Sequence, residues 1–286
     1  MNPLRSILVT GASGFIGRRL CGRAREQGIE VRALVRTTLD GPWDTQVVAD
    51  LTENIPKDAL KGIDTVFHLG ARASFESYRR LRPTIVDGSV SLMRAAAAAG
   101  VKSFVFASSL FVHGSQDAPI DATTPPDPAL GYGRAKQEAE IRLTGLADEA
   151  GIALGNIRLP HVYGSHSVLF EQIRRGLAIF PGSMTNQCGH LHVDDAARVL
   201  IEAGRQRWRG ASPVADRHPA DWREFFAIVR EMDPRVMFVR LPQWMGYAGA
   251  AAAAPMLSLR TRPTLYTAGT VTGFNLNLPV SPLSLI

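Results

Sequence analysis

The sequence predicts an α/β protein built on a doubly wound parallel sheet, with a smaller C-terminal lobe. Short apolar runs alternate with longer amphipathic runs through the first half of the chain, which is typical of a parallel sheet covered by helices on both faces. The amphipathic runs end at glycines, a common helix stop. We expect strands at 6–10, 31–35, 65–69, 103–107 and 153–158, and helices at 15–28, 86–99 and 132–150.

The alternation becomes irregular after Gly164. We expect a strand at 190–193 that leads into a helix at 194–203, and a second amphipathic helix at 220–232. Residues 244–259 are mostly Ala and Gly and are expected to form a helix packed inside the protein, while the tail from Arg260 has no clear pattern. The sequence therefore predicts a large domain over 1–165 and a smaller lobe over 166–286, interleaved with the first.

Composition narrows the classes of partner. The formal charge of the 286-residue chain is +6, but the basic residues are scattered and no aromatic stripe runs among them, so nucleic-acid binding is not expected. Cys21 and Cys188 lack metal-ligand spacing, and no metal site is predicted. The N-terminus lacks signal-peptide features, so a cytoplasmic protein is expected. The segment 244–259 is too short and too poor in large apolar residues to form a membrane-spanning helix. A membrane-surface contact is only a lesser alternative.

A glycine-rich loop directly follows the first expected strand and opens the first helix. Its glycines are spaced G-x-x-G-x-x-G, so the chain can turn tightly and present backbone N–H groups to a pyrophosphate at the helix N-terminus. This context favours a dinucleotide site over a purely structural turn. The residues expected to contact the cofactor are Gly11, Ser13, Gly14, Phe15, Ile16 and Gly17.

The end of the second expected strand bears on the choice between NAD(H) and NADP(H). NAD sites commonly place an acidic residue there to bind the ribose 2′-hydroxyl, whereas an arginine can pair with a 2′-phosphate. This strand ends in Arg36, with Arg18 as a possible helper. The sequence therefore favours NADP(H), and NAD(H) remains possible. Asp50 and Leu51 follow a third strand-like run, where the carboxylate could accept from the adenine amino group.

Tyr132 and Lys136 lie four residues apart, on one face of an expected helix. A free tyrosine titrates near pH ~10. A neighbouring ammonium and an oxidised nicotinamide both favour the phenolate, so the pair could pass a proton to or from a substrate oxygen. Ser109 stands at the carboxyl end of a strand and could donate a hydrogen bond to the same oxygen; a serine that satisfies a turn is the alternative.

These motifs, in their order and spacing, resemble the extended short-chain dehydrogenase/reductases, the NAD-dependent epimerase/dehydratase family. The resemblance runs from about residue 5 to about residue 235 and rests on the glycine loop, the 66–71 segment VFHLGA, the serine pair 108–109, the YGRAK helix, RLPHVYG at 158–164 and HVDD at 192–195. It implies a Rossmann-type NAD(P)-binding domain over 1–165 and a substrate-binding lobe over 166–286. It also implies a small-molecule substrate and allows a homodimer.

The resemblance also implies roles for individual residues. Ser109, Tyr132 and Lys136 would be catalytic. Leu69, Gly70 and Ala71 would line the path of the pyrophosphate and ribose, with Ser108 and Pro160 near the nicotinamide. The HVDD motif would cap a helix that starts at Asp194 or Asp195.

Departures from the family pattern bear on the substrate. Nucleotide-sugar enzymes such as UDP-galactose 4-epimerase carry Asn where this chain has His161, which is assigned to substrate binding, and Arg where it has Cys188. The leading hypothesis is an NAD(P)(H)-dependent oxidoreductase that transfers hydride to or from a carbonyl or hydroxyl carbon of a small or apolar substrate. The alternative is a nucleotide-sugar epimerase or ketoreductase. A non-catalytic NADP sensor is the lesser alternative.

Overall fold

The computed structural model describes residues 4–174, 177–217, 220–258 and 267–281. Its centre is a seven-stranded parallel sheet, so the predicted fold class is confirmed. The chain leaves β1 toward one edge of the sheet through β2 and β3, and then crosses to the other side of β1 from β4 onward, so a crevice is expected at the carboxyl ends of β1 and β4. In sheet order the strands are β11 (Gly210–Pro213), β6 (Ala153–Leu159), β5 (Ser103–Ser109), β4 (Thr65–His68), β1 (Ser6–Thr10), β2 (Glu30–Val35) and β3 (Thr45–Val48).

Helices cover both faces of this sheet, because the central strands carry apolar residues on both sides. On one face α1 (Phe15–Glu26) and α6 (Val193–Arg205) pack over Ile7 and Val9. On the other face α3 (Gly88–Ala98) and α4 (Gly131–Ala150) pack over Leu8.

Several expected elements have shifted boundaries. The helix expected from Val86 begins at Gly88, after the short helix α2 (Tyr78–Arg82) and a π-helical turn, η2 (Pro83–Asp87). The helix expected at Asp194 or Asp195 begins at Val193, and its N-cap is His192, whose Nδ1 accepts from the Asp194 N–H at 3.3 Å. The HVDD motif therefore caps this helix, as expected, but through His192, and the helix starts one or two residues earlier than expected.

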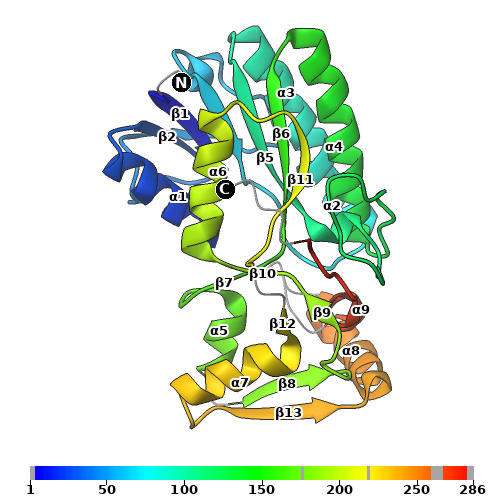
Figure 1. Ribbon diagram of the computed structural model, residues 1–286. Coiled ribbons are helices and arrows are strands. Elements are labelled where there is room, and N and C mark those ends of the chain that lie inside the picture. Colours follow the sequence, from blue (N-terminus) through cyan, green and yellow to red (C-terminus); the bar gives the residue numbers. More distant parts are fainter. Residues whose placement is uncertain (1–3, 175–176, 218–219, 259–266, 282–286) are drawn as a thin grey trace.

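The C-terminal lobe lies beyond the carboxyl ends of the large sheet (Figure 1). Its core is aromatic: Trp222, Phe225 and Phe226 of α7 pack against Phe180 of β8. The lobe contains β7 (His161–Tyr163) paired with β10 (His190–His192), β8 (Leu177–Pro181) paired with β13 (Met237–Leu241), β9 (Gln187–Cys188) paired with β12 (Ala220–Asp221), and the helices α5 (Val168–Ile173), α7 (Trp222–Met232), α8 (Gln243–Ser258) and α9 (Ala268–Asn275).

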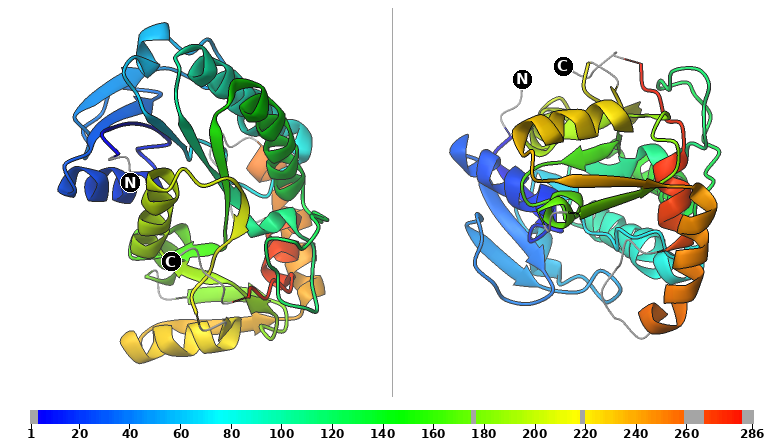
Figure 2. Two further views of the ribbon diagram at one scale, coloured as in Figure 1. Left: turned by 45° about the horizontal axis from the view of Figure 1, so that its top comes forward. Right: turned by 90° about the horizontal axis from the view of Figure 1, so that it is seen from below.

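The two parts of the chain are interleaved. Although they lie beyond residue 165, α6 and β11 belong to the large sheet and its helical cover. The tail then returns from the lobe, as Figure 2 also shows. Leu278 bridges to Cys188 in the lobe, while Val280 bridges to Ile120 in the large domain. The boundary at 165 therefore does not divide the structure cleanly.

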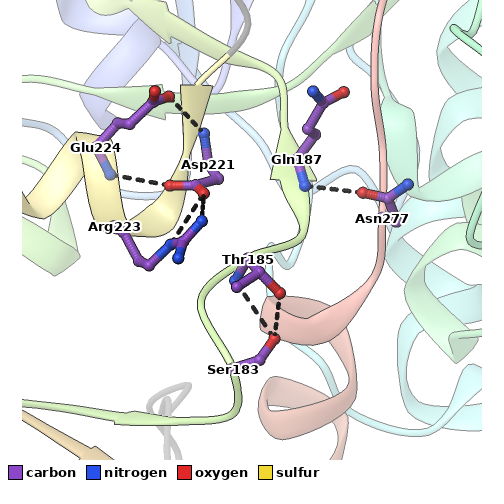
Figure 3. A network of polar contacts seen from close by, with 7 residues as sticks. All are labelled: Ser183, Thr185, Gln187, Asp221, Arg223, Glu224 and Asn277. Carbon is purple, nitrogen blue, oxygen red and sulfur yellow. Dashed lines mark hydrogen bonds and ion pairs between the residues drawn. The ribbon is translucent and has the colours of Figure 1, made fainter.

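Polar contacts fix the helix and the tail of the lobe in place (Figure 3). Asp221 and Glu224 form a capping box at the start of α7, in which the Glu224 N–H donates to Asp221 Oδ1 at 2.9 Å. On the neighbouring strand β9, Gln187 pairs with Asp221, and its N–H donates to Asn277 Oδ1 at 2.8 Å. These contacts hold α7 and the returning tail beside the junction with the large domain.

One expectation about the lobe is wrong. Residues 243–258 do form a helix, α8, but it is not packed inside the protein: Trp244 is 69% exposed and Met256 is 62% exposed. Among the described residues, no helix combines the length and the apolar character needed to cross a membrane.

Candidate active site

The glycine loop adopts a conformation that its glycines require. Gly11 has φ +67°, and a Cβ added there would lie 2.8 Å from the Gly70 nitrogen. A Cβ on Gly17 would lie 2.1 Å from the Gly11 carbonyl oxygen. Since neither position tolerates a side chain, the loop packs directly against Leu69 and Gly70, which follow β4.

The first turn of α1 fits an anionic group. Its N-cap is Gly14, which provides no side-chain hydrogen bond, and no acidic residue lies in the first turn. The N–H groups of Phe15, Ile16 and Gly17 therefore lack a capping acceptor and lie at the positive end of the helix dipole. Ser13 and Gly14 are exposed at this point. A dinucleotide pyrophosphate matches these donors.

A buried chain of hydrogen bonds holds the neighbouring Gly70. The Gly70 N–H donates to Thr10 Oγ1 at 2.9 Å, and that hydroxyl lies 2.7 Å from His68 Nδ1. His68 Nε2 lies 2.7 Å from Ser89 Oγ, which donates to the Ile85 carbonyl at 2.5 Å. Because Ser89 gives its only hydrogen to the Ile85 carbonyl, it must accept from His68 Nε2. His68 therefore carries its proton on Nε2, and its Nδ1 accepts from Thr10.

Burial lowers the pKa of His68 to about 3, so its ring is neutral. The residue acts on the position of Gly70, and through it on Leu69 and Ala71. Sequence reasoning quoted His68 only as part of a motif. The available signal was a polar ring directly after Val66 and Phe67, at the end of a short strand.

Residues around the expected adenosine half are arranged as follows. Arg36 is exposed at the end of β2, and no hydrogen bond or ion pair to it is found within the described part of the chain. Arg18 instead donates to the Asp40 carbonyl at 3.2 Å. Asp50 accepts from Thr52 N–H and Oγ1, and these bonds lower the pKa of its carboxyl.

Leu51 is buried behind Asp50 and is not at the protein surface. It is 8% exposed, and a Cβ on Gly70 would lie 2.8 Å from its Cδ1. Its contribution is to support the Gly70 segment from below.

Ser109, Tyr132 and Lys136 meet where β5 ends and α4 begins. Ser109 Oγ accepts from the Phe111 N–H at 3.2 Å, which leaves its own hydrogen free to donate. Lys136 is buried one helical turn from Tyr132; its Nζ donates to the Ala107 carbonyl at 2.7 Å and lies 5.8 Å from the centre of the Tyr132 ring.

Burial controls the protonation of this pair. It raises the pKa of Tyr132 to about 12 and lowers that of Lys136 to about 7. We expected Lys136 to favour the phenolate form of Tyr132, but burial outweighs this effect in the protein without bound cofactor. Tyr132 keeps its proton at neutral pH, the state that a general acid needs.

Gly133 allows α4 to approach the turn that follows β5. A Cβ at this position would lie 1.8 Å from the Phe111 carbonyl oxygen. The turn is a short 3-10 helix, η3 (Leu110–Val112), and it begins directly after Ser109. The glycine between Tyr132 and Lys136 thus sets the distance between the helix and the serine.

An aromatic wall stands beside Tyr132. The ring of Phe75 lies 6.4 Å and that of Phe111 6.3 Å from the Tyr132 ring, both edge-on. Helix α9 supports Phe75 from behind, because a Cβ on Gly273 would lie 3.0 Å from Phe75 Cζ. The sequence alone did not identify Phe75, since its neighbours on the wall come from distant parts of the chain.

Ser108 points away from Ser109, as alternate residues of a strand do. Its hydroxyl donates to Glu140, which forms a buried ion pair with Arg158 at 2.8 Å. Arg158 also contacts His113 at 3.3 Å. The Ser108 side chain therefore ties α4 to the sheet. A contact between Ser108 and the nicotinamide stays a prediction, and it would involve the backbone of this residue.

His161 lies at the junction with the lobe. Its Nδ1 is 3.2 Å from Nδ1 of His190, and its ring packs 5.1 Å from the Trp222 ring. Burial lowers the pKa of His161 to about 3. Pro160 lies directly before it and packs on the Gly189 backbone. Cys188 and Cys21 are buried free thiols.

Within the described ranges, no three His, Cys, Asp or Glu residues are grouped so that they could hold a metal ion. The site instead combines a cradle for an anionic dinucleotide with a serine, a tyrosine and a lysine at the next strand end. That combination defines a nicotinamide-dependent enzyme on a Rossmann-type sheet.

Comparison with known proteins gives the family. The model of the NAD dependent epimerase/dehydratase family matches residues 7–214, and the chain belongs to this family. A 3-beta-hydroxysteroid dehydrogenase from Mycolicibacterium neoaurum is 35% identical over 178 residues, which are 56% of this chain and 48% of that protein. A ceramide reductase from Caulobacter vibrioides is 25% identical over 276 residues, 92% of this chain and 82% of that protein.

A solved structure of MoeE5 in complex with UDP-glucose and NAD is also similar. It is 28% identical, has a TM-score of 0.75, and the match covers 83% of this chain and 85% of that one. The chain spans about half the length of the curated relatives that it matches first. The relatives with stated activities are dehydrogenases, reductases and an epimerase, which agrees with an NAD(P)-dependent oxidoreductase and also fits an epimerase.

Proposed function

We propose that the chain is an oxidoreductase that uses NADP(H) to reduce or form a carbonyl group on a small or apolar substrate. The observation that carries this proposal is Tyr132, a protonated phenol whose ring lies beside the contacting rings of Phe75 and Phe111. A sugar nucleotide would place many hydroxyl groups against such a wall without partners, which is costly. An apolar ketone matches the wall.

The catalytic roles follow from the geometry of the described residues. When bound, the nicotinamide supplies or accepts the hydride. Tyr132 donates its proton to the carbonyl oxygen during reduction, and Ser109 donates a hydrogen bond to the same oxygen as negative charge develops there. Lys136 lies beneath the Tyr132 ring and stabilises the phenolate that this proton transfer leaves.

The cofactor lies, in this proposal, along the carboxyl ends of β1, β2 and β4. The pyrophosphate binds the first turn of α1, and Asp50 faces the adenine. His161 belongs to the substrate side of the site. The residues proposed to contact the cofactor are Gly11, Ser13, Gly14, Phe15, Ile16, Gly17, Arg36, Asp50, Leu69, Gly70, Ala71, Ser108, Tyr132, Lys136 and Pro160. Leu51, which was expected among them, supports Gly70 from below.

The preference for NADP(H) is supported by Arg36. Its guanidinium is exposed at the end of β2, where an acidic residue would favour the 2′-hydroxyl of NAD. Replacing it in an Arg36→Ala variant removes a charge-assisted contact to the 2′-phosphate, so the Kd for NADPH should rise about tenfold. The Kd for NADH is the internal control and should change less than about twofold, because NADH lacks that phosphate. Equal effects on both cofactors would contradict the preference.

The reaction class is tested by steady-state consumption of NADPH with a series of apolar ketones and, separately, with UDP-sugars. The proposal predicts continuous turnover with ketones. The second candidate, a nucleotide-sugar epimerase, is favoured by the resemblance to MoeE5, which was solved with UDP-glucose and NAD. It predicts tightly retained cofactor, conversion of a UDP-sugar and no net oxidation of NADPH.

We further propose a cytoplasmic location, since the buried thiols Cys21 and Cys188 are both unpaired and fit a reducing compartment. The homodimer expected from the family resemblance stays a prediction.

A further inference from the structure

Helix α8 is exposed although nearly all of its residues are apolar. It contains no Asp, Glu, Lys, Arg or His, whereas a helix that is apolar on all sides is normally buried. Its large side chains face outward: Trp244 is 69% exposed, Met256 is 62% exposed, and Met245 and Tyr247 are also exposed. This surface lacks the polar side chains that usually cover an exposed helix.

A narrow seam of small residues attaches α8 to the lobe. A Cβ on Gly246 would lie 2.4 Å from Pro181 Cβ, and 3.2 Å from Val271 Cγ2 of α9. Ala250, one turn further along the same face, is 7% exposed. The small residues therefore make the closest contacts with the protein. Tyr247 also reaches α9, where its hydroxyl lies 3.0 Å from Thr272 Oγ1, whereas Trp244 and Met256 are mostly exposed.

The apolar surface continues from α8 onto the neighbouring ribbon of β8 and β13. Met237 and Val239 alternate along β13 and are 61% and 38% exposed, and Ile179, paired with Val239, is 56% exposed. Seen from below, this ribbon lies between α7 and α8 on one end of the molecule (Figure 2). We call the exposed apolar residues of α8 and of this ribbon the apolar end face.

Charge indicates what covers the apolar end face. Residues 234–286 contain four arginines and no Asp, Glu or Lys. Arg240 is exposed just before α8, and none of the described acidic residues pairs with it. Apolar side chains with Trp and Tyr, bordered by arginine, are typical of helices that lie in the interface of a membrane with anionic lipids. Arg235, before β13, is paired with Asp233 at 2.9 Å, so among the described residues of this segment Arg240 supplies the unpaired positive charge.

We propose that the apolar end face docks on the surface of a bilayer that contains anionic phospholipid, with α8 lying in the plane of the interface. Trp244, Met245 and Met256 enter the boundary between headgroups and acyl chains, and Arg240 remains at the level of the phosphates. The proposal rests on the surface alone and does not depend on the reaction at Tyr132.

The test is binding of the full chain to vesicles, measured by flotation. Vesicles of equal parts phosphatidylcholine and phosphatidylglycerol should bind the protein, and pure phosphatidylcholine should bind it about tenfold more weakly. A double variant, Trp244→Ser with Met256→Ser, should lower the partition coefficient at least about tenfold. The matched control is Val48→Ser, which removes a side chain that is 51% exposed on the large domain; its binding should change less than about twofold.

Three results would overturn the proposal: no binding to anionic vesicles, equal binding by the double variant and the native chain, or a dimer in sedimentation velocity that the double variant dissociates. The last result would make the apolar end face an interface between two copies. Because Trp244 and Met256 are exposed, the double variant should keep the native circular dichroism spectrum and melting temperature. Binding is compared only after this is established.

Discussion

The protonation of Lys136 links the buried site to the pH of the solution. Its Nζ has a carbonyl and two aromatic rings as neighbours, and burial lowers its pKa to about 7 from 10.5. The ammonium is therefore lost as the pH rises through about 7, and not near 10.5. Above that pH, the phenolate left by proton donation from Tyr132 loses the stabilising charge of Lys136.

This predicts the pH dependence of ketone reduction. With saturating cofactor and substrate, kcat should be highest below pH ~7 and fall as the pH rises toward ~9, because fewer molecules carry the Lys136 ammonium. The measurement is kcat against pH, with protein stability monitored across the same range. A kcat that stays constant up to pH ~9 would show that the charge of Lys136 does not matter in this way.

At the scale of elements, the site depends on how closely α4 approaches the turn after β5. That approach is possible only because Gly133 lacks a side chain. The same helix contains Gly145, where an added Cβ would meet nothing within 4 Å. Substituting Gly133 therefore tests the close approach, and substituting Gly145 in the same helix is its control.

We predict that Gly133→Ala pushes the start of α4 away from Phe111 and lowers kcat/KM at least about tenfold, with a loss of stability of about 1–3 kcal/mol from overpacking. Gly145→Ala should stabilise the protein by up to about 1 kcal/mol, since alanine is the better helix former, and should leave kcat/KM unchanged. Urea unfolding and steady-state kinetics on both variants make the comparison. Equal activity of the two variants would refute this explanation of Gly133.

The sequence predicted the elements that local patterns define. Strand β1, the glycine loop and helix α4 follow from short apolar runs and helix stops, and the position of Tyr132 and Lys136 on one face follows from helical spacing. Contacts between distant residues were not predictable in this way. His68 meets Thr10 across 58 positions, and α8 was expected to be buried because its composition is apolar. Composition cannot show which surface a helix meets.

At the scale of the whole molecule, the buried neutral His68 makes stability depend on pH. Its pKa in the folded protein is about 3, whereas in the unfolded chain it is about 6.5. The unfolded state therefore takes up a proton first as the pH falls. The stability contributed by the neutral ring is complete above pH ~6.5 and is lost toward pH ~3, at about 1.4 kcal/mol per pH unit.

This predicts a specific difference between the native chain and a His68→Gln variant. Between pH ~7 and ~5 the native chain should lose about 2 kcal/mol more of its free energy of unfolding than the variant, whose side chain does not titrate. Urea unfolding at both pH values measures the difference. An identical loss in the two proteins would mean that His68 is not held neutral in the fold.

The central claim is that Tyr132 donates the proton in a reaction driven by a nicotinamide cofactor bound at the glycine loop. The most direct test is Tyr132→Phe, which removes one hydroxyl and keeps the ring that packs edge-on beside Phe75 and Phe111. The Kd for NADPH should remain within about twofold of the native value, while turnover of a ketone substrate should fall at least ~100-fold, since a positioned general acid typically contributes that much. A variant that retains full turnover would contradict the account.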